Sequence, residues 1–140
     1  MPDSPSSAAD ELADKLTLVS RLIRRASRDL PLPPHQVRAL RIIAREPIRP
    51  ARLAEHLHIT PRAVTDVVDT LTEGGYITAT ADPTDRRAKI LSTTPAGTDL
   101  LAIAQQLREA EAKKLFSHLS EDEQRTLLDL LTRILTPHRV

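Results

Sequence analysis

Apolar residues recur at helical spacing along most of the chain. The first such stretch covers residues 9–30, in which an apolar side chain returns every three or four positions and forms one continuous stripe. The proline-rich segment 31–34 interrupts this pattern, because proline removes a helical donor and biases the residue before it toward extended backbone. A second helical pattern follows over residues 35–45. Two helices are therefore predicted before residue 46.

The middle of the chain contains two shorter helical patterns joined by a tight turn at residues 58–59. Each pattern begins with a proline, Pro50 or Pro61, at the first helical position, where a missing N–H costs nothing. Thr60 precedes the second proline, and its side chain suits the N-cap of the second helix. A glycine pair ends that helix. This part of the chain is predicted to form a helix-turn-helix.

β-branched residues become frequent after the glycine pair, and they predict two strands over residues 76–80 and 88–93. The intervening residues 82–87 are predicted to form a turn that carries two arginines. Ile48 is expected to pair briefly beside this hairpin as a third strand. A short helix pair followed by a hairpin with a basic tip is typical of a winged helix-turn-helix, which is a DNA-binding element.

Two further helices close the chain. Residues 94 and 95 repeat the cap-and-proline start and open a helix to about residue 119. Ser120 and Glu123 then have the spacing of a capping box at the start of the last helix, which is expected to stop at Pro137. The sequence therefore predicts a mainly α (α+β) fold, in which a winged helix-turn-helix core is flanked by N-terminal and C-terminal helices.

The first and last helices carry more apolar surface than the winged core needs. One interpretation is a single packed core, and the other is a dimer interface built by the chain ends, which we expect here. This divides the chain into a disordered tail (1–9), an N-terminal dimerisation helix (10–34), a winged domain (35–97) and C-terminal dimerisation helices (98–140). The predicted interface residues are Leu12, Leu16, Val19, Leu127, Leu131, Ile134 and Leu135.

Composition changes this picture only slightly. The 140 residues carry a net charge of +1 and include no cysteine, which excludes disulfides and thiolate metal sites. A strongly basic chain would indicate nucleic-acid binding, but here only residues 36–90 have an excess of positive charge, with nine basic and seven acidic residues. No apolar run reaches the roughly 18 residues of a membrane span, and no secretion signal begins the chain, so we expect a cytoplasmic protein without a membrane partner.

The wing contains a motif of a known family. The segment 85–87, which reads Asp-Arg-Arg, is followed by five residues and then by segment 93–97, and together they resemble the wing signature of the MarR family of bacterial transcription regulators. Segments 82–83 and 64–71 are similar to that family as well. The resemblance covers roughly residues 10–136, and the order of the elements agrees throughout.

This resemblance implies a triangular homodimer whose terminal helices interlock and whose two winged lobes straddle a palindromic operator. It also implies repression, and release by a small molecule, often a phenolic or other aromatic anion, bound between the dimer helices and the winged lobe. The sequence specifies little of such a ligand, because only Tyr76 and Phe116 are aromatic. Arg41 or Arg45 would meet a carboxylate of the ligand or remain solvated.

Several positions depart from the family pattern. Thr93 replaces a leucine at the base of the wing, and Asp66 and Thr70 stand where many members carry arginine. Residues 78–80 also lack the arginines that many members have. We expect these departures to lower the affinity for DNA rather than to change the fold.

The second helix of the helix-turn-helix is expected to enter the major groove. Arg62 would contact a guanine or a phosphate, and Asp66 would accept from a cytosine amine or remain a solvated carboxylate. Thr60 would act as a helix cap, as a phosphate contact, or as both. The residues predicted to contact DNA from this helix are Thr60, Pro61, Arg62, Thr65 and Asp66.

The wing is expected to reach the minor groove through Arg86 and Arg87, where narrow A·T tracts concentrate negative potential. Asp85 would orient Arg87 through an ion pair. The alternative is a solvated turn with an exposed ion pair. Three further basic residues would contact phosphates or remain solvated, namely Arg49, Arg52 and Lys89.

The sequence favours three other functions less. An enzyme is not expected, because the chain has neither a nucleophile-elbow motif nor a phosphate-cradling loop, and no cofactor is indicated. A metal-responsive regulator would need more than the pair His56 and His58, which is typical of surface residues. The last alternative is a winged helix that has lost DNA binding and serves as a protein-interaction module.

Overall fold

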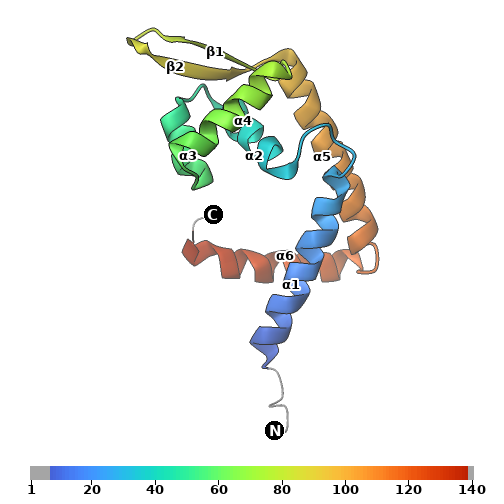
Figure 1. The fold of residues 1–140 in the computed structure, drawn as a ribbon. Coiled ribbons are helices and arrows are strands. Elements are labelled where there is room, and N and C mark those ends of the chain that lie inside the picture. The colour runs from blue at the N-terminus through green and yellow to red at the C-terminus, as the bar shows by residue number, and fades with distance from the viewer. Residues whose placement is uncertain (1–6, 139–140) are drawn as a thin grey trace, which may run out of the picture.

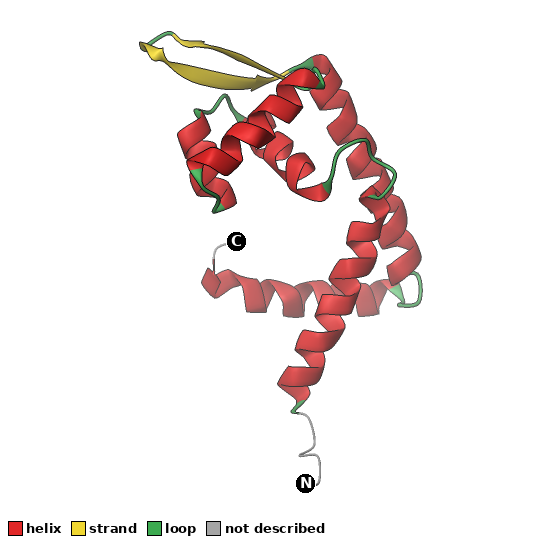
Figure 2. Ribbon diagram, in the orientation of Figure 1, coloured by secondary structure: helices red, strands yellow, loops and turns green. Residues whose placement is uncertain are grey.

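The computed structural model describes residues 7–138, and Figures 1 and 2 show a winged lobe joined to three longer helices. Helices dominate, and the two strands form one antiparallel hairpin. The mainly α winged helix-turn-helix fold predicted from the sequence is confirmed. The elements in chain order are α1 (Ala8–Arg24), η1 (Arg25–Ser27), α2 (Pro34–Arg45), α3 (Pro50–Leu57), α4 (Pro61–Glu73), β1 (Ile77–Asp82), β2 (Asp85–Thr93), α5 (Pro95–Phe116), α6 (Glu121–Leu135) and η2 (Thr136–His138).

The first helix differs from its predicted range at both ends. It begins at Ala8 because the Ser7 side chain accepts a hydrogen bond from the Asp10 N–H, so residues 8–9 are helical rather than part of a disordered tail. Residues 1–6 of that predicted tail lie outside the described residues. The helix ends at Arg24 and continues only as a 3₁₀ turn, because the chain must leave the helix axis to bury Leu32 in the core.

The helix-turn-helix forms as its prolines and cap predict. Pro50 and Pro61 occupy the first turns of α3 and α4, and the Thr60 hydroxyl accepts from the Ala63 N–H at 3.1 Å. Between the helices, His58 takes a left-handed conformation with φ of 55°, a region that disfavours most side chains. The turn therefore depends on the left-handed backbone of His58, whose N–H donates to the carbonyls of Ala54 and Glu55.

The hairpin is longer, and its turn tighter, than the sequence predicts. β1 and β2 pair from Ile77 opposite Thr93 to Asp82 opposite Asp85, with an irregularity at residues 81–82. The turn is thus formed by residues 83–84 alone, and the predicted turn over 82–87 is wrong. Its arginines lie on β2 just beyond the tip, because the Asp82 side chain accepts the Thr84 N–H and closes the turn early. Ile48 forms the predicted bridge, with Leu91.

The core lies inside the winged lobe. Its fully buried large side chains come from α2, α3, α4 and both strands, and they are Leu40, Ile43, Leu53, Leu71, Ile77 and Leu91. Two residues of α5, Leu100 and Ala104, join this core from the side. The N-terminal part of α5 is thereby packed against the lobe, while its C-terminal part extends away from it (Figure 1).

The terminal helices leave their apolar sides uncovered. Neither α1 nor α6 contains a buried residue. Leu12, Leu128 and Ile134 expose 59%, 62% and 54% of their surfaces. Of the predicted interface residues, Leu16 and Leu135 are exposed as well, and Val19, Leu127 and Leu131 are half-buried. The single packed core, the other interpretation of these helices, therefore does not form within one chain.

Among the described residues, no helix has both the length and the apolar composition that crossing a membrane requires.

Candidate nucleic-acid interface

The N-terminal end of α4 presents a group of polar side chains to solvent. Thr60, Pro61, Arg62, Thr65 and Asp66 are all exposed, as the predicted contact with DNA requires. The Thr65 hydroxyl donates to the Pro61 carbonyl at 3.0 Å, so its remaining lone pairs face outward as acceptors. The free N–H groups of the first turn also favour an anion at this end.

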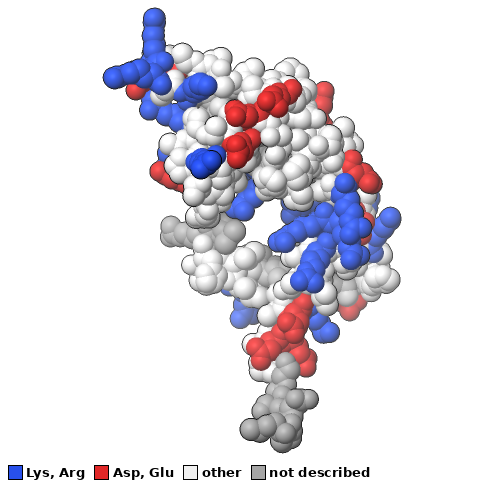
Figure 3. All heavy atoms as spheres, viewed as in Figure 1, with Lys and Arg blue, Asp and Glu red and all other residues white. Residues whose placement is uncertain are grey.

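The rest of α4 is acidic on its outer side. Asp66, Asp69 and Glu73 are exposed, and Arg62 is the sole cation of the helix. Figure 3 shows these acidic side chains over α4 and a group of basic side chains at the tip of the hairpin. A surface charged in this way repels phosphates along most of α4 and attracts them at its first turn and at the wing.

The wing supplies the most accessible cations near α4. Arg86, Arg87 and Lys89 are exposed on β2, and the Arg87 side chain is 96% exposed. The Asp85 carboxylate accepts the Arg87 N–H at 3.1 Å and lies 3.7 Å from the Arg87 Nε atom. Arg87 is thus tethered at its backbone and loosely paired at its head group. In Figure 1 the wing tip and the N-terminal end of α4 point to the same side.

Arg49 and Asp82 form an ion pair that sequence reasoning missed. The Asp82 Oδ2 atom lies 2.8 Å from the Arg49 Nε and 2.7 Å from its Nη2, while Asp82 Oδ1 accepts from both the N–H and the hydroxyl of Thr84. Asp82 is buried, and Arg49 keeps 43% of its side chain exposed. The pair therefore joins the start of α3 to the wing tip. The Asp-Pro-Thr order suits such a turn, but only the folded chain identifies the partner.

The hydrogen bonds around Asp82 also fix its ionisation. The Thr84 N–H and hydroxyl, and then Arg49, all stabilise the carboxylate and lower the pKa of Asp82 to about 2 from the ordinary 3.8. Asp82 is therefore charged throughout the physiological range, and the Arg49 pair persists there.

Arg52 lies on the exposed side of α3. Its Nη1 atom pairs with Glu55 Oε2 at 2.7 Å one turn further along the helix, and both side chains are 64% exposed. Pairs of this kind contribute little to stability and exchange readily with solvent or a phosphate. Arg52 thus remains available as a predicted phosphate contact. Arg49 is available only in part, because its head group pairs with Asp82.

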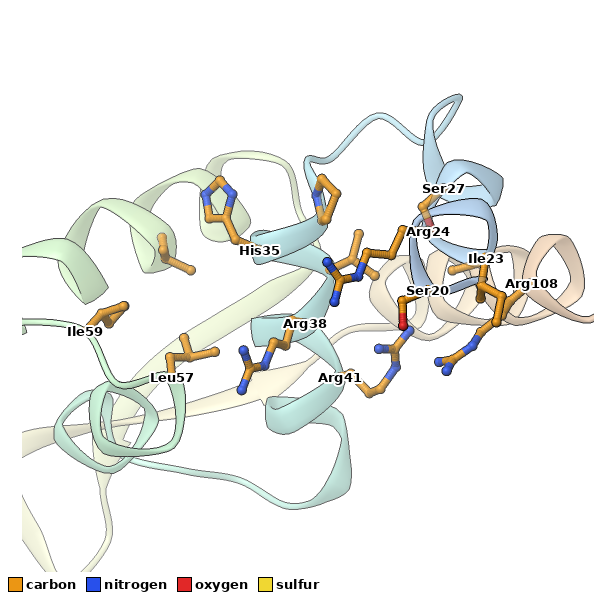
Figure 4. A pocket seen from close by; sticks show the side chains of 14 residues that line it. Ser20, Ile23, Arg24, Ser27, His35, Arg38, Arg41, Leu57, Ile59 and Arg108 are labelled. Carbon is orange, nitrogen blue, oxygen red and sulfur yellow. The ribbon is translucent and has the colours of Figure 1, made fainter. Parts of the chain in front are cut away.

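A pocket of about 580 Å³ lies between α1 and α5 on one side and the winged lobe on the other. Figure 4 shows that Arg24 of α1, Arg41 of α2 and Arg108 of α5 turn toward the gap between α1 and α2, while Arg38 extends toward Leu57 and Ile59. Of the two arginines considered from the sequence, Arg41 lines the pocket and Arg45 does not. No sequence signal singled out Arg24, Arg38 or Arg108.

The histidine pair of the turn does not build a metal site with other ligands. Across residues 7–138, no three His, Asp or Glu side chains converge closely enough to hold a metal ion.

Comparison with known proteins agrees with this geometry. The sequence profile of the MarR family matches residues 30–88. A protein of Thauera aromatica, named as a transcriptional regulatory protein for the hcr operon, is 33% identical over 96 residues, and the alignment covers 68% of this chain and 58% of the Thauera protein.

Solved structures extend the likeness to nearly the whole chain. Transcriptional regulator Tm0710 from Thermotoga maritima is 31% identical and has a TM-score of 0.71, with 91% of each chain covered. The transcriptional repressor CouR, solved on a 23-mer DNA duplex, is 25% identical and has a TM-score of 0.70, with 91% of this chain and 92% of CouR covered.

Proposed function

This chain belongs to the MarR family of transcriptional regulators, and from this premise we propose that it is a repressor which binds a palindromic operator as a homodimer. The observation that carries the proposal is the wing, where the exposed Arg86 and Arg87 follow the tip on β2, and the tip points to the same side as the first turn of α4. The CouR complex with a DNA duplex supports this use of the fold.

In this proposal the first turn of α4 lies in the major groove. Arg62 contacts a guanine or a phosphate, Thr65 and Pro61 line the helix start, and Thr60 caps the helix beside the backbone. Asp66 accepts from a cytosine amine, a contact that an arginine at this position would not make. Arg87 and Arg86 enter the minor groove, and Asp85 orients Arg87. Phosphates are held by Lys89, Arg52 and the exposed part of Arg49.

The uncovered terminal helices supply the proposed dimer interface. Leu12, Leu16, Ile134 and Leu135 are exposed in one chain, so a second copy would remove a large apolar surface from water. A ligand bound in the pocket between α1, α5 and the winged lobe would change the spacing of the two lobes, and it would release DNA if it bound the two spacings with different affinity.

Fluorescence anisotropy tests the proposal. The full-length protein is titrated into a duplex from the region upstream of its own gene and into a scrambled duplex of equal composition, each over a salt series. We expect preferential binding to the upstream duplex that weakens steeply with salt. Arg87→Ala should reduce the slope of log K against log salt by about 2, because each of the two wings in the homodimer loses one phosphate or groove contact.

Arg28→Ala is the matched control, because Arg28 is exposed on the loop after η1, away from the wing. Its slope should equal that of the wild type. Absence of binding to any duplex in a genome-wide selection would contradict the proposal, and the acidic outer side of α4 would then favour a protein-interaction module. Reporter output from the adjacent promoter should rise when the gene is deleted, whereas a fall would indicate activation.

A further inference from the structure

The pocket between α1, α2 and α5 has a lining of one charge sign. Four arginines reach it from three elements, Arg24 from α1, Arg38 and Arg41 from α2, and Arg108 from α5, and no Asp or Glu lines it. Within residues 7–138, none of these four guanidinium groups makes an ion pair or a hydrogen bond with another side chain.

This concentration of positive charge is unfavourable, because the guanidinium groups repel one another. Arg41 is half-buried, and desolvation together with the nearby charges of Arg108 and Arg45 lowers the pKa of Arg41 below its ordinary value. A guanidinium that loses water without gaining an anion destabilises the fold. A bound anion of sufficient charge would reverse this cost, since it would supply the missing acceptors.

The opposite wall of the pocket is apolar. Leu57 and Ile59 lie on this wall (Figure 4), and Val67 of α4 also lines the pocket. No Phe, Tyr or Trp lines the pocket, and His35 is its one ring-bearing side chain apart from proline, so a ligand ring would gain mainly area burial there. A ligand of this pocket would therefore be recognised mainly through the charge of its head group rather than through an aromatic ring.

We propose that this pocket binds a small organic phosphate, with its dianionic head group among Arg24, Arg41 and Arg108 and its apolar body against the helix-turn-helix wall. A phosphate dianion presents three oxygens and accepts bidentate contacts from more than one guanidinium, whereas a monocarboxylate offers one charge and two oxygens. The Ser20 and Ser27 hydroxyls, which also line the pocket, supply further donors.

The ligand deepens the proposed function, on which this inference rests. Its head group would connect α1 and α5 to α2. These two helices would thereby be fixed to the lobe that carries α3 and α4. A phosphate ester of the cell would then be the effector that sets the spacing of the lobes, in place of the phenolic monoanion expected from the family resemblance.

Binding is tested without DNA by titration calorimetry of the full-length protein. Phenyl phosphate and benzoate are the probes, because they share one ring and differ in head group, and inorganic phosphate tests the head group alone. We expect phenyl phosphate to bind about ten-fold more tightly than benzoate, and Arg41→Gln and Arg108→Gln each to weaken it by about ten-fold. Arg21→Gln is the matched control, since Arg21 is exposed on α1 but does not line the pocket, and it should bind as the wild type does.

The outcomes separate the alternatives. Equal affinity for benzoate and phenyl phosphate, or an equal loss in Arg21→Gln, would overturn the proposal. Weaker operator binding by Arg41→Gln in the absence of any probe would overturn it too, because the arginines would then belong to the DNA interface. Phosphate binding in a protein that binds no operator would refute the proposed repressor function alone. Phosphate binding that lowers operator affinity in the wild type, but not in Arg41→Gln, would support both.

Discussion

One buried carboxylate determines the geometry of the wing tip. Asp82 accepts two hydrogen bonds from Thr84 and pairs with Arg49, so it closes the turn and fixes it to the start of α3. Without these bonds a two-stranded hairpin that projects from the lobe would be only marginally stable. The position of Arg86 and Arg87 therefore depends on a buried residue that is itself shielded from solvent.

Asp82→Asn is expected to loosen this tip. Its amide retains one acceptor for Thr84 but turns an NH₂ group toward the donors of Arg49, so the ion pair is lost. Thermal unfolding should show a fall in Tm of several degrees, with faster hydrogen exchange at the Thr84 amide. Asp85→Asn, which alters a half-exposed carboxylate on the opposite strand of the hairpin, should change Tm much less. Equal effects of the two substitutions would argue against a special role for Asp82.

The lowered pKa of Asp82 also predicts how stability depends on pH. The pKa falls from an ordinary 3.8 to about 2 on folding, so the folded state binds this proton less readily than the unfolded state. The stability that Asp82 supplies is complete above about pH 4 and is lost as the pH falls toward 2. The free energies of unfolding of wild type and Asp82→Asn should therefore converge over this range, as urea titrations at several pH values would measure. A constant difference across the range would refute this assignment.

One joint connects α4, the wing and α5. The Thr94 N–H donates to the Tyr76 carbonyl at 3.0 Å, and the Thr94 hydroxyl donates to the Gly75 carbonyl at 2.6 Å while it caps α5. Gly97 lies against the same Tyr76 carbonyl, where a side chain has no room. The end of α4, the base of the hairpin and the start of α5 therefore behave as one unit.

Gly97→Ala tests this joint. The added Cβ would overlap the Tyr76 carbonyl oxygen, which is backbone and cannot rotate away, and would lie 2.8 Å from Thr93 Cγ2. We expect a loss of about 3 kcal/mol in the free energy of unfolding, measured by chemical denaturation. Gly74→Ala is the control, since its Cβ would meet the Tyr76 ring, a side chain that is able to move, and it should cost less. A cost for Gly97→Ala below that of Gly74→Ala would show that the joint is not tight.

The elements themselves were largely predictable because their signals are local. Pro50, Pro61 and Thr60 mark helix starts through backbone chemistry that does not depend on the fold, and the capping box of Ser120 and Glu123 forms with both of its hydrogen bonds. The hairpin turn was mispredicted, since Asp82 closes it through Thr84 and is itself held by Arg49, which lies 33 residues away. Local propensity does not report such a pair.

The molecule consists of a winged lobe and of terminal helices, α1 and α6, whose apolar sides are uncovered. The core lies within the lobe and the first half of α5, while α1 and α6 carry exposed leucines and isoleucines and bury none of their residues. The apolar excess of these helices was visible in the sequence. The arginine pocket was not, because Arg24, Arg41 and Arg108 are far apart in the chain and meet only when α1, α2 and α5 pack.

A charge placed on the apolar side of α6 should dissociate the proposed dimer. Ile134→Asp puts a carboxylate at a half-exposed apolar position of α6, and burying it against a second copy would cost several kcal/mol. Light scattering after size exclusion should give the mass of two chains for the wild type and of one chain for the variant. Thr72→Asp, at an exposed position of α4 outside the terminal helices, should remain a dimer. A wild-type mass of one chain would exclude the dimer.

Because α5 is long and is fixed to the wing at Thr94 and Gly97, a small tilt of this helix moves the wing. Its 22 residues span about 33 Å, and one end is locked to the wing while the other leads into α6. Such a helix is a lever arm, so a tilt of about 5° at the α6 end would displace the wing by about 3 Å, close to the rise of two helical residues. In the proposed dimer on DNA, an angular change at the α6 end of the helix would therefore shift the wing along the duplex, and the stiffness of α5 would determine how constant the distance between the two wings remains.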